Sequence, residues 1–203
     1  ELARRAIADS LSVHRRQSLH ALVLTALVNR GSDALLAPIV HHAAQAGDSA
    51  AVLKYAPVAA RQAAALSAHR ESASHYQIAL QYAGELALEE RAKLFEHRSY
   101  ECFLTDQTEE ALQARWEALE IWKQMGNHLR EGDSLRWISR INWFLGRGLE
   151  AETFGNEAVS VLETLPPGPE LAMASSNRSQ LHMLAEEMEK AVLWGSRAIE
   201  LAR

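Results

Sequence analysis

Residues 139–158 read SRINWFLGRGLEAETFGNEA, and the stretches 40 residues before and after it, 99–118 and 179–198, repeat its pattern. A serine opens each stretch and two alanines follow it at fixed distances. The three sets are Ser99, Ala111 and Ala118; Ser139, Ala151 and Ala158; and Ser179, Ala191 and Ala198. Large apolar residues keep the same spacing, as in Phe103, Trp143 and Met183 or Leu119, Val159 and Ile199. Agreement in several independent columns predicts a repeat protein.

Each unit of this pattern predicts two helices. The first helices are expected at 89–104, 128–145 and 170–184, and the second at 108–125, 149–165 and 187–201. The serine and alanine columns lie where paired helices must approach closely, since a bulky side chain there would push them apart. Helix formers dominate the composition and runs of alternating β-branched residues are absent. We therefore expect an all-α fold, a right-handed superhelical array of nine or ten helices in antiparallel pairs, without strands.

The part of the chain before residue 88 follows the pattern less closely. Ser72, Tyr76 and Ala79 precede Ala111, Arg115 and Ala118 by 39 residues, which indicates a degenerate unit. Further helices are expected at 34–46 and 49–66, with a kink at Pro57. A short helix, Ser12 as a cap and a long amphipathic helix closed by Gly31 are expected before them.

Charge and composition narrow the function classes. With a formal charge of -5 and a pI near 6.0, the chain lacks the net positive charge that dominates nucleic-acid affinity, so it is a poor candidate for DNA binding. The longest apolar runs are far shorter than the ~20 residues that cross a bilayer, and no secretory signal opens the chain. Cys102 is the sole cysteine, which excludes disulfide scaffolds. A cytoplasmic location is the expectation, and a start without Met indicates a piece of a longer protein.

Motifs for chemistry are missing from the sequence. It contains no Gly-rich phosphate-binding loop and no Gly-x-Ser-x-Gly elbow. His41 and His42 are adjacent, and His69 and His75 are six apart, so each pair points to different faces of a helix, a poor geometry for one metal ion. We expect no enzyme activity, no cofactor and no metal site.

The repeat pattern resembles the tetratricopeptide repeat (TPR). In the last unit Asn177, Ser179, His182, Ala191 and Ala198 match the asparagine, small, aromatic, alanine and alanine columns of that motif. The period of 40 instead of 34 residues departs from it, and the early Trp column holds Phe95, Leu135 and Ser175. These departures imply longer helices and loops within the same fold.

The N-terminal sequence resembles a more specific family of proteins. Three strings, ELARRAI at 1–7, HAAQAGD at 42–48 and YAPVAAR at 55–61, are similar to the entry into the TPR-like sensor of large ATP-dependent LuxR-type (MalT-like) bacterial transcriptional regulators. The resemblance implies three parts. Residues 1–31 close an upstream helical or winged-helix-like domain, 32–87 form degenerate entry helices, and 88–203 hold three repeats at about 88–127, 128–167 and 168–203.

The resemblance implies an effector-sensing or protein-interaction scaffold for signal transduction, in which ATP and DNA are bound only by domains outside this chain. The alternative is a regulatory TPR module of a signalling enzyme, such as an adenylate cyclase or kinase fused to the same ATPase. A carboxylate-clamp receptor is disfavoured, because its Lys and Asn columns hold Glu96, Tyr100, Trp137 and Met173 here.

The same resemblance places a binding surface. In TPR arrays the first helix of each pair lines a concave groove, where a peptide, a protein domain or a small effector binds. The matching columns are Lys93, Glu96, Tyr100 and Phe103; Asp133, Arg136, Arg140 and Trp143; and Met173, Ser176, Gln180 and Met183. Arg136, Arg140 and Trp143 share a helix face and suit a carboxylate or phosphate on an apolar body. The alternative is that Arg136 pairs with Glu96 across neighbouring repeats, which leaves a solvated groove without a ligand.

Overall fold

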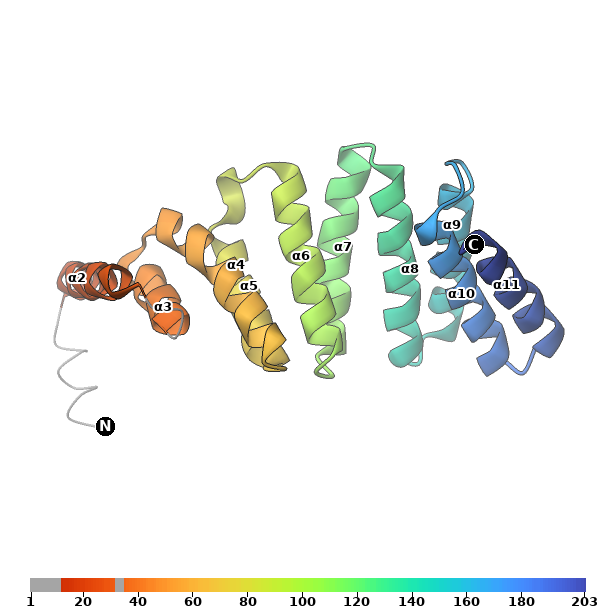
Figure 1. The fold of residues 1–203 in the computed structure, drawn as a ribbon, viewed down its shortest axis with the longest axis horizontal. Coiled ribbons are helices and arrows are strands. Elements are labelled where there is room, and N and C mark those ends of the chain that lie inside the picture. The colour runs from red at the N-terminus through yellow and green to blue at the C-terminus, as the bar shows by residue number, and fades with distance from the viewer. Residues whose placement is uncertain (1–11, 32–34) are drawn as a thin grey trace. The chain divides into compact units, whose positions relative to one another are not determined.

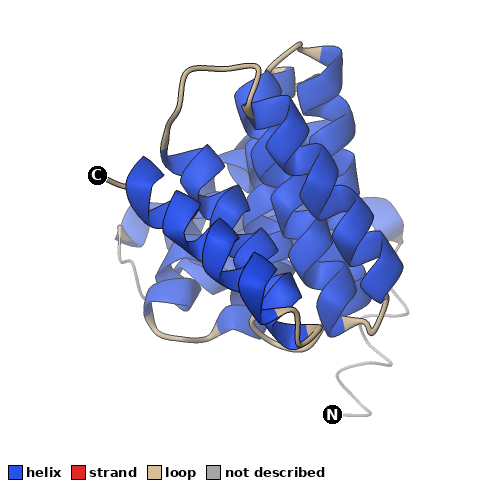
Figure 2. Cartoon of the chain, turned by 90° about the vertical axis from the view of Figure 1, so that its right-hand side faces the viewer, coloured by secondary structure: helices blue, strands red, loops and turns tan. Residues whose placement is uncertain are grey.

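The computed structural model describes residues 12–31 and 35–203, which form ten α-helices and one short 3-10 helix (Figure 1). No strand occurs within these residues, as Figure 2 shows. The all-α prediction is confirmed. The short helix expected before Ser12 lies outside the described residues.

The chain divides into two compact units. Unit 1, Glu1–Leu86, contains α2 (Val13–Arg30), α3 (Leu36–Ala46), α4 (Ser49–Ala65), α5 (His69–Gln81) and the 3-10 helix η2 (Ala83–Glu85). Unit 2, Ala87–Arg203, contains α6 (Leu88–Phe103), α7 (Thr108–Gln124), α8 (His128–Phe144), α9 (Gly148–Leu162), α10 (Pro169–Leu184) and α11 (Met188–Leu201).

The helix boundaries follow local signals in the sequence. The Ser12 side chain accepts from the Arg15 amide, and Asp48 and Asn127 cap α4 and α8 in the same way. Gly31 ends α2 with a left-handed backbone. Pro57 lies inside α4 without ending it. Among the helix ends of unit 2, the end of α9 differs most from its predicted position. This helix ends at Leu162 instead of residue 165, because the prolines that follow favour extended backbone.

One hydrogen bond recurs in each helix pair of unit 2. The Ser99 hydroxyl donates to the Ala111 carbonyl at 2.8 Å, and the same bond joins Ser139 to Ala151 at 2.6 Å and Ser179 to Ala191 at 2.7 Å. The closest packing of unit 2 lies within the pairs α6–α7, α8–α9 and α10–α11. The serine and alanine columns are therefore the places where paired helices meet.

A second column sets the turn within each pair. After each first helix, one residue of the turn has a left-handed backbone, and these residues are 40 positions apart. They are Asp106, Gly146 and Glu186, with φ of 59°, 74° and 61°. Only Gly146 adopts this conformation without a steric cost at Cβ. The turn geometry is thus a property of the repeat and not of a glycine at each turn.

Apolar side chains fill the space between the two helices of the first pair of unit 2. Trp122, Ala118 and Ile121 of α7 pack with Ala92 of α6 in one buried cluster. Trp122 is 1% exposed and belongs to the core. Cys102 is also buried, and burial raises the pKa of its thiol, so it acts as a small apolar residue.

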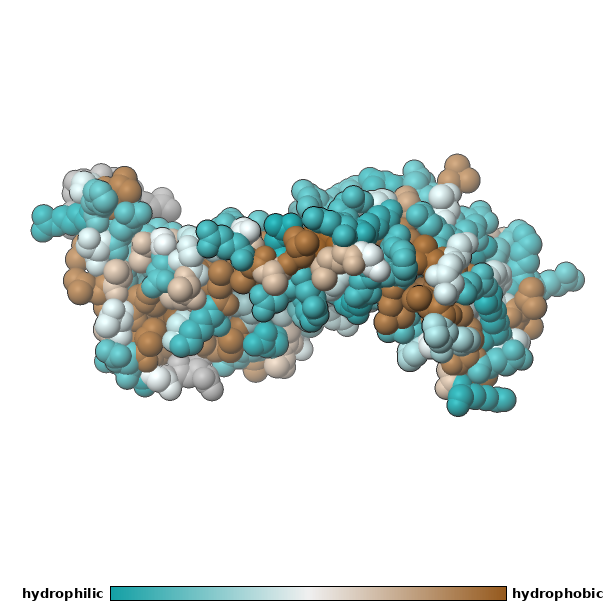
Figure 3. All heavy atoms as spheres, turned by 90° about the horizontal axis from the view of Figure 1, so that it is seen from above, coloured by the Kyte–Doolittle hydropathy of each residue, from teal (hydrophilic) through white to brown (hydrophobic). Residues whose placement is uncertain are grey.

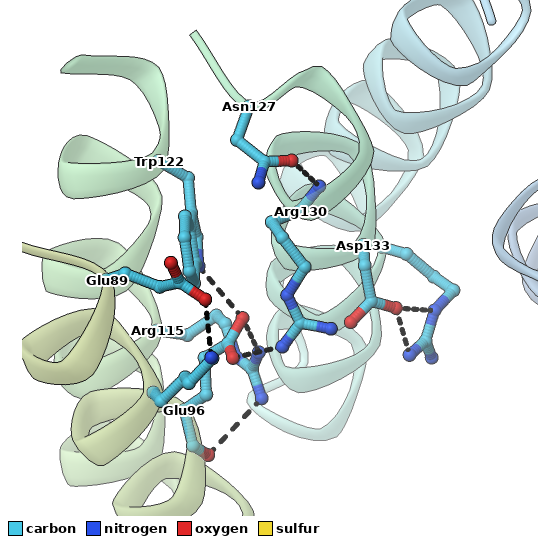
Figure 4. A network of polar contacts seen from close by, with 9 residues as sticks. Glu89, Glu96, Arg115, Trp122, Asn127, Arg130 and Asp133 are labelled. Atoms are coloured by element: carbon cyan, nitrogen blue, oxygen red, sulfur yellow. Dashed lines mark hydrogen bonds and ion pairs between the residues drawn. The ribbon is translucent and has the colours of Figure 1, made fainter. Parts of the chain in front are cut away.

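A buried charge network joins α6, α7 and α8 (Figure 4). The Glu96 carboxylate accepts from the Trp122 indole at 3.0 Å, and it pairs with Arg115 at 3.4 Å and with Arg130. Burial lowers the pKa of the Arg115 guanidinium to about 10, although the neighbouring Glu96 raises it. Arg115 therefore stays charged at neutral pH, and Glu96 compensates a cation that is 3% exposed.

Removal of the serine hydroxyl is expected to destabilise two repeats by different amounts. Ser139 also accepts from the Asn177 side chain at 2.9 Å, so Ser139→Ala leaves a buried amide without its acceptor. We expect a loss of about 1–3 kcal/mol in the free energy of unfolding, against about 0.5–1.5 kcal/mol for Ser179→Ala. Urea unfolding followed by tryptophan fluorescence measures both, because all five tryptophans lie in unit 2. Equal losses would contradict the assigned role of Asn177.

The charge network predicts a larger effect at Glu96. Glu96→Gln keeps the shape of the side chain but removes the ion-pair partner of the buried Arg115. We expect the free energy of unfolding to fall by about 3–5 kcal/mol. The matched control is Glu89→Gln, which breaks an exposed ion pair with Lys93 on the same helix and should change stability far less. Similar results for the two variants in the same urea experiment would show that the network is not a stabilising element.

Candidate functional site

The first helices of unit 2 present a row of aromatic rings. Tyr100 and Phe103 of α6 meet Trp137 of α8 edge to face, with ring centroids 5.7 and 5.6 Å apart. Phe144 lies 5.0 Å from both Phe103 and Trp143. We call these five residues the aromatic strip. Edge-to-face contacts hold the rings in place, so the strip is a preformed surface.

The strip is partly open to solvent. Tyr100 is 44% exposed and Phe144 is 52% exposed. Met183 of α10, another residue predicted for the groove, is also exposed. Apolar residues reach the surface in patches among hydrophilic ones (Figure 3). Large exposed apolar side chains that gather on one surface are typical of binding sites.

Arg140 connects the strip to α10. Its Nη1 donates to Gln180 Oε1 at 3.0 Å, and its guanidinium lies 5.8 and 5.9 Å from the ring centroids of Phe103 and Phe144. Partial burial lowers the pKa of Arg140, and the nearby Arg136 lowers it further. Gln180 is the only hydrogen-bond partner of this guanidinium within the described residues, so other N–H groups remain for an anionic ligand.

Two of the predicted groove residues are not exposed. Glu96 is 6% exposed and belongs to the network with Arg115, and Arg136 is 7% exposed. Arg136 pairs with Asp133 at 2.7 Å and stacks on Trp137 at 4.8 Å from the ring centroid. The expectation that these two side chains face solvent is wrong: Glu96 is held by side chains of α7 and α8, and Arg136 is held by Asp133 and Trp137 of its own helix. The alternative, an ion pair between Arg136 and Glu96, does not form either, because Arg136 pairs with Asp133 and Glu96 pairs with Arg115 and Arg130.

The remaining predicted residues are spread along the same helices. Lys93 is exposed and pairs with Glu89, while Met173 and Ser176 are exposed on α10. The structure therefore brings five of the predicted residues together, directly or through Trp137 and Phe144: Tyr100, Phe103, Arg140, Trp143 and Gln180. The other predicted residues make none of these contacts.

A second site lies between the last two helix pairs and was missed by the sequence reasoning. It is a pocket of about 240 Å³ whose lining includes Trp143, Glu152, Arg178, Leu181, His182 and Glu187. Arg178 and His182 are each 5% exposed. A comparison of the 40-residue columns could have found it, because Glu152 of α9 and Arg178 of α10 occupy the columns of Leu112 in α7 and Ile138 in α8.

Hydrogen bonds fix the protonation of the histidine in this pocket. Arg178 Nη2 lies 2.9 Å from His182 Nε2, and a guanidinium can only donate, so Nε2 is the acceptor. The proton is then on Nδ1, which donates to Glu187 Oε2 at 2.6 Å. Hydrogen bonds from Lys190 first and His182 second lower the pKa of Glu187. His182 is thus a neutral link between a buried guanidinium and a carboxylate.

The histidines of unit 1 form a separate cluster. The Nδ1 atoms of His20 and His42 are 2.8 Å apart, and the His41 ring lies 5.7 and 5.1 Å from their centroids. Burial, followed by the neighbouring histidines, lowers the pKa of His20 and His42, so one imidazole donates to the other. Across residues 12–31 and 35–203, no group of three ligating side chains is placed to hold a metal ion. Within the same ranges, no helix has the length and apolar character of a membrane span.

Comparison with protein-family models finds no match, and comparison with curated proteins finds none either. Solved structures do share the fold. A signal transduction ATPase with numerous domains from Pyrococcus horikoshii, which has a tetratricopeptide repeat sensor, matches with a TM-score of 0.68 and 14% identity over 95% of this chain and 31% of that chain.

Two further structures cover similar shares of this chain. BtubC from P. vanneervenii matches with a TM-score of 0.66 and 13% identity over 95% of this chain and 92% of that chain. Rap protein complexed with competence and sporulation factor matches with a TM-score of 0.60 and 15% identity over 98% and 57%. At these identities the likeness shows the fold alone: the chain is an all-helical array of TPR-like repeats.

Proposed function

We propose that this chain is a binding module, not an enzyme, and that it recognises a partner through the aromatic strip and Arg140. The observation that carries the proposal is the position of Arg140, whose guanidinium lies beside exposed aromatic rings and is held by Gln180. An anion bound there would meet a charge that is already oriented, so little side-chain entropy is lost on binding.

The partner suited to this surface is a peptide or protein segment in which a carboxylate or phosphate lies beside an apolar side chain. Arginine forms directional charge-assisted bonds with such anions, and the rings provide apolar contact area. A small effector with the same two groups fits the same chemistry. The Rap protein, solved in complex with competence and sporulation factor, is a fold neighbour with a bound partner.

The biological setting belongs to the proposal as well. We infer that the module senses a signal within a multidomain bacterial regulator of the LuxR type in the cytoplasm, where domains outside this chain bind ATP and DNA. The fold neighbour with a TPR sensor on a signalling ATPase supports this setting. A regulatory module of a signalling enzyme fused to the same kind of ATPase is the alternative, and the output domain of the full-length protein distinguishes the two.

Arg140→Ala tests the proposed surface. A random peptide library displayed on phage is selected against the wild-type chain, and the affinity of the selected peptides is then measured by calorimetry. We expect Arg140→Ala to weaken binding by about 1–3 kcal/mol, the scale for one charge-assisted contact. The melting temperature should change little, because the side chain is only partly buried.

Arg197→Ala is the matched control, since Arg197 is a partly exposed arginine on α11 that stacks on Trp194 and pairs with Glu163, away from the strip. It should leave peptide affinity unchanged. Selected peptides that bind the Arg140 variant as tightly as the wild type, or a large drop in its melting temperature, would assign Arg140 a structural role instead.

A further inference from the structure

The pocket beside α10 lies where unit 2 departs from its own repeat. Leu112 of α7 and Ile138 of α8 are 7% and 0% exposed. Forty residues later the same columns hold Glu152 of α9 and Arg178 of α10. Two charged side chains thus take the place of two buried aliphatic ones at the boundary between neighbouring helix pairs.

A third column changes with them. Gly155 of α9 occupies the column of Arg115 in α7, and a Cβ atom at Gly155 would lie 3.2 Å from Arg178 Cδ. A side chain at Gly155 would therefore compete with Arg178 for the same space. Three coordinated differences from the preceding unit indicate that the pocket is built and is not a packing defect.

The guanidinium of Arg178 has fewer acceptors than donors. The residue is 5% exposed, and Nη2 donates to His182 Nε2, but Nε and Nη1 are buried without a hydrogen-bond partner among the described residues. The Glu152 carboxylate is 3.9 Å from Nη2, too far for a hydrogen bond. A buried charged donor without a partner is costly, so this arrangement calls for an acceptor from a ligand.

The other charged groups of the pocket cancel. Glu187 accepts from His182 Nδ1 at 2.6 Å and from Lys190 at 2.8 Å. The Glu152 side chain is 57% exposed and makes no hydrogen bond within the described residues. Two carboxylates, the Lys190 ammonium and the Arg178 guanidinium sum to a charge of zero around the neutral His182. Arg178 and Glu152 therefore remain as two groups of opposite charge that can still form hydrogen bonds.

A ligand that carries both charges suits these two groups. A cation alone would leave the Arg178 donors without an acceptor, and an anion alone would face the Glu152 carboxylate. The carboxylate and ammonium groups of an α-amino acid share one carbon atom, so one molecule can reach two charges that are 3.9 Å apart. The pocket of about 240 Å³ has room for about eight water molecules, which is the size of a small amino acid.

We propose that this pocket binds a free α-amino acid with an apolar side chain. Its carboxylate accepts hydrogen bonds from Arg178, its ammonium group donates to Glu152, and its side chain contacts Trp143 and Leu181. Bonds between two charged groups are the strong ones, and the apolar contacts orient the ligand. The inference goes beyond the proposed function, because the ligand is different and the site shares only Trp143 with the aromatic strip.

Matched probes that lack one charge test the proposal. L-Leucine is titrated into the ¹⁵N-labelled chain, and the amide shifts of residues 148–152 and 178–187 are followed by NMR. 4-Methylpentanoate lacks the ammonium group, and L-leucinamide lacks the anionic carboxylate and resembles the first residue of a peptide. We expect saturable shifts with L-leucine and an affinity at least about tenfold lower for both analogues, because each loses one charge-assisted contact.

The absence of saturable shifts with L-leucine would overturn the proposal. Equal affinity for 4-methylpentanoate would assign the pocket to a simple carboxylate, and equal affinity for L-leucinamide would assign it to the N-terminus of a peptide. Either result overturns a free amino acid as the ligand. D-Leucine should bind more weakly than L-leucine, because three separate contacts distinguish the enantiomers, and equal affinity would contradict the assigned contacts.

Variants then locate the contacts. Glu152→Gln should raise the dissociation constant of L-leucine at least about tenfold without weakening 4-methylpentanoate, since it removes the ammonium partner and a negative charge. Glu157→Gln on the same helix is the matched control and should change neither. The double variant E152L/R178I restores the aliphatic pair of the preceding unit, and it should keep the melting temperature and abolish binding. An unchanged affinity of Glu152→Gln for L-leucine overturns the proposal even if the double variant fails to fold.

One further variant separates this pocket from the aromatic strip. Arg140→Ala should leave L-leucine binding unchanged, so failure of the strip as a binding surface would not affect this result. Loss of L-leucine binding in the Arg140 variant would move the ligand to the strip and overturn the assignment to the pocket.

Discussion

The close approach of two helices at a serine and an alanine is the constraint on which unit 2 is built. A serine hydroxyl on the first helix bonds a carbonyl on the second, at 2.6 to 2.8 Å in all three pairs. Such a bond requires small side chains at the contact, and Ala111, Ala151 and Ser139 are fully buried there. Because the donor is a side chain and the acceptor is backbone, the bond fixes the register of the pair as well as its spacing.

Once the pairs are fixed, residues 40 positions apart face each other across neighbouring repeats. Arg140 and Gln180 are related in this way, and their hydrogen bond links α8 to α10. Asn177 reaches Ser139 from the next pair and ties the serine bond of one repeat to its neighbour. The aromatic strip has the same origin, since Phe103 and Trp143 occupy one column and meet through Phe144. A periodic sequence thus produces a continuous surface without long-range connections.

The charged columns show how the repeat diverges while the helices stay the same. Glu96, Arg136 and Ser176 occupy one column and have three different environments: a buried ion-pair network, a stack on Trp137 and an exposed surface. Gly155 of α9 occupies the column of Arg115 in α7, and its missing side chain leaves space for Arg178 of α10. Each exchange keeps the backbone and changes the chemistry between two pairs. Specific binding sites in such an array are therefore expected at the boundaries between pairs, where the columns differ most.

The sequence by itself determined the helices, their pairing and the columns at which they meet. Those features depend on local signals, such as Ser12 and Asn127 as caps, and on a period that any two repeats reveal. Only the tertiary structure decided which polar side chains are buried. Glu96 and Arg136 lie at a column that a TPR array exposes, yet both side chains are buried. The pocket at Arg178 depends likewise on Glu152 and Gly155 from another helix. Burial and protonation are set by all the neighbours of a residue, and a helical period describes only the residue's own helix.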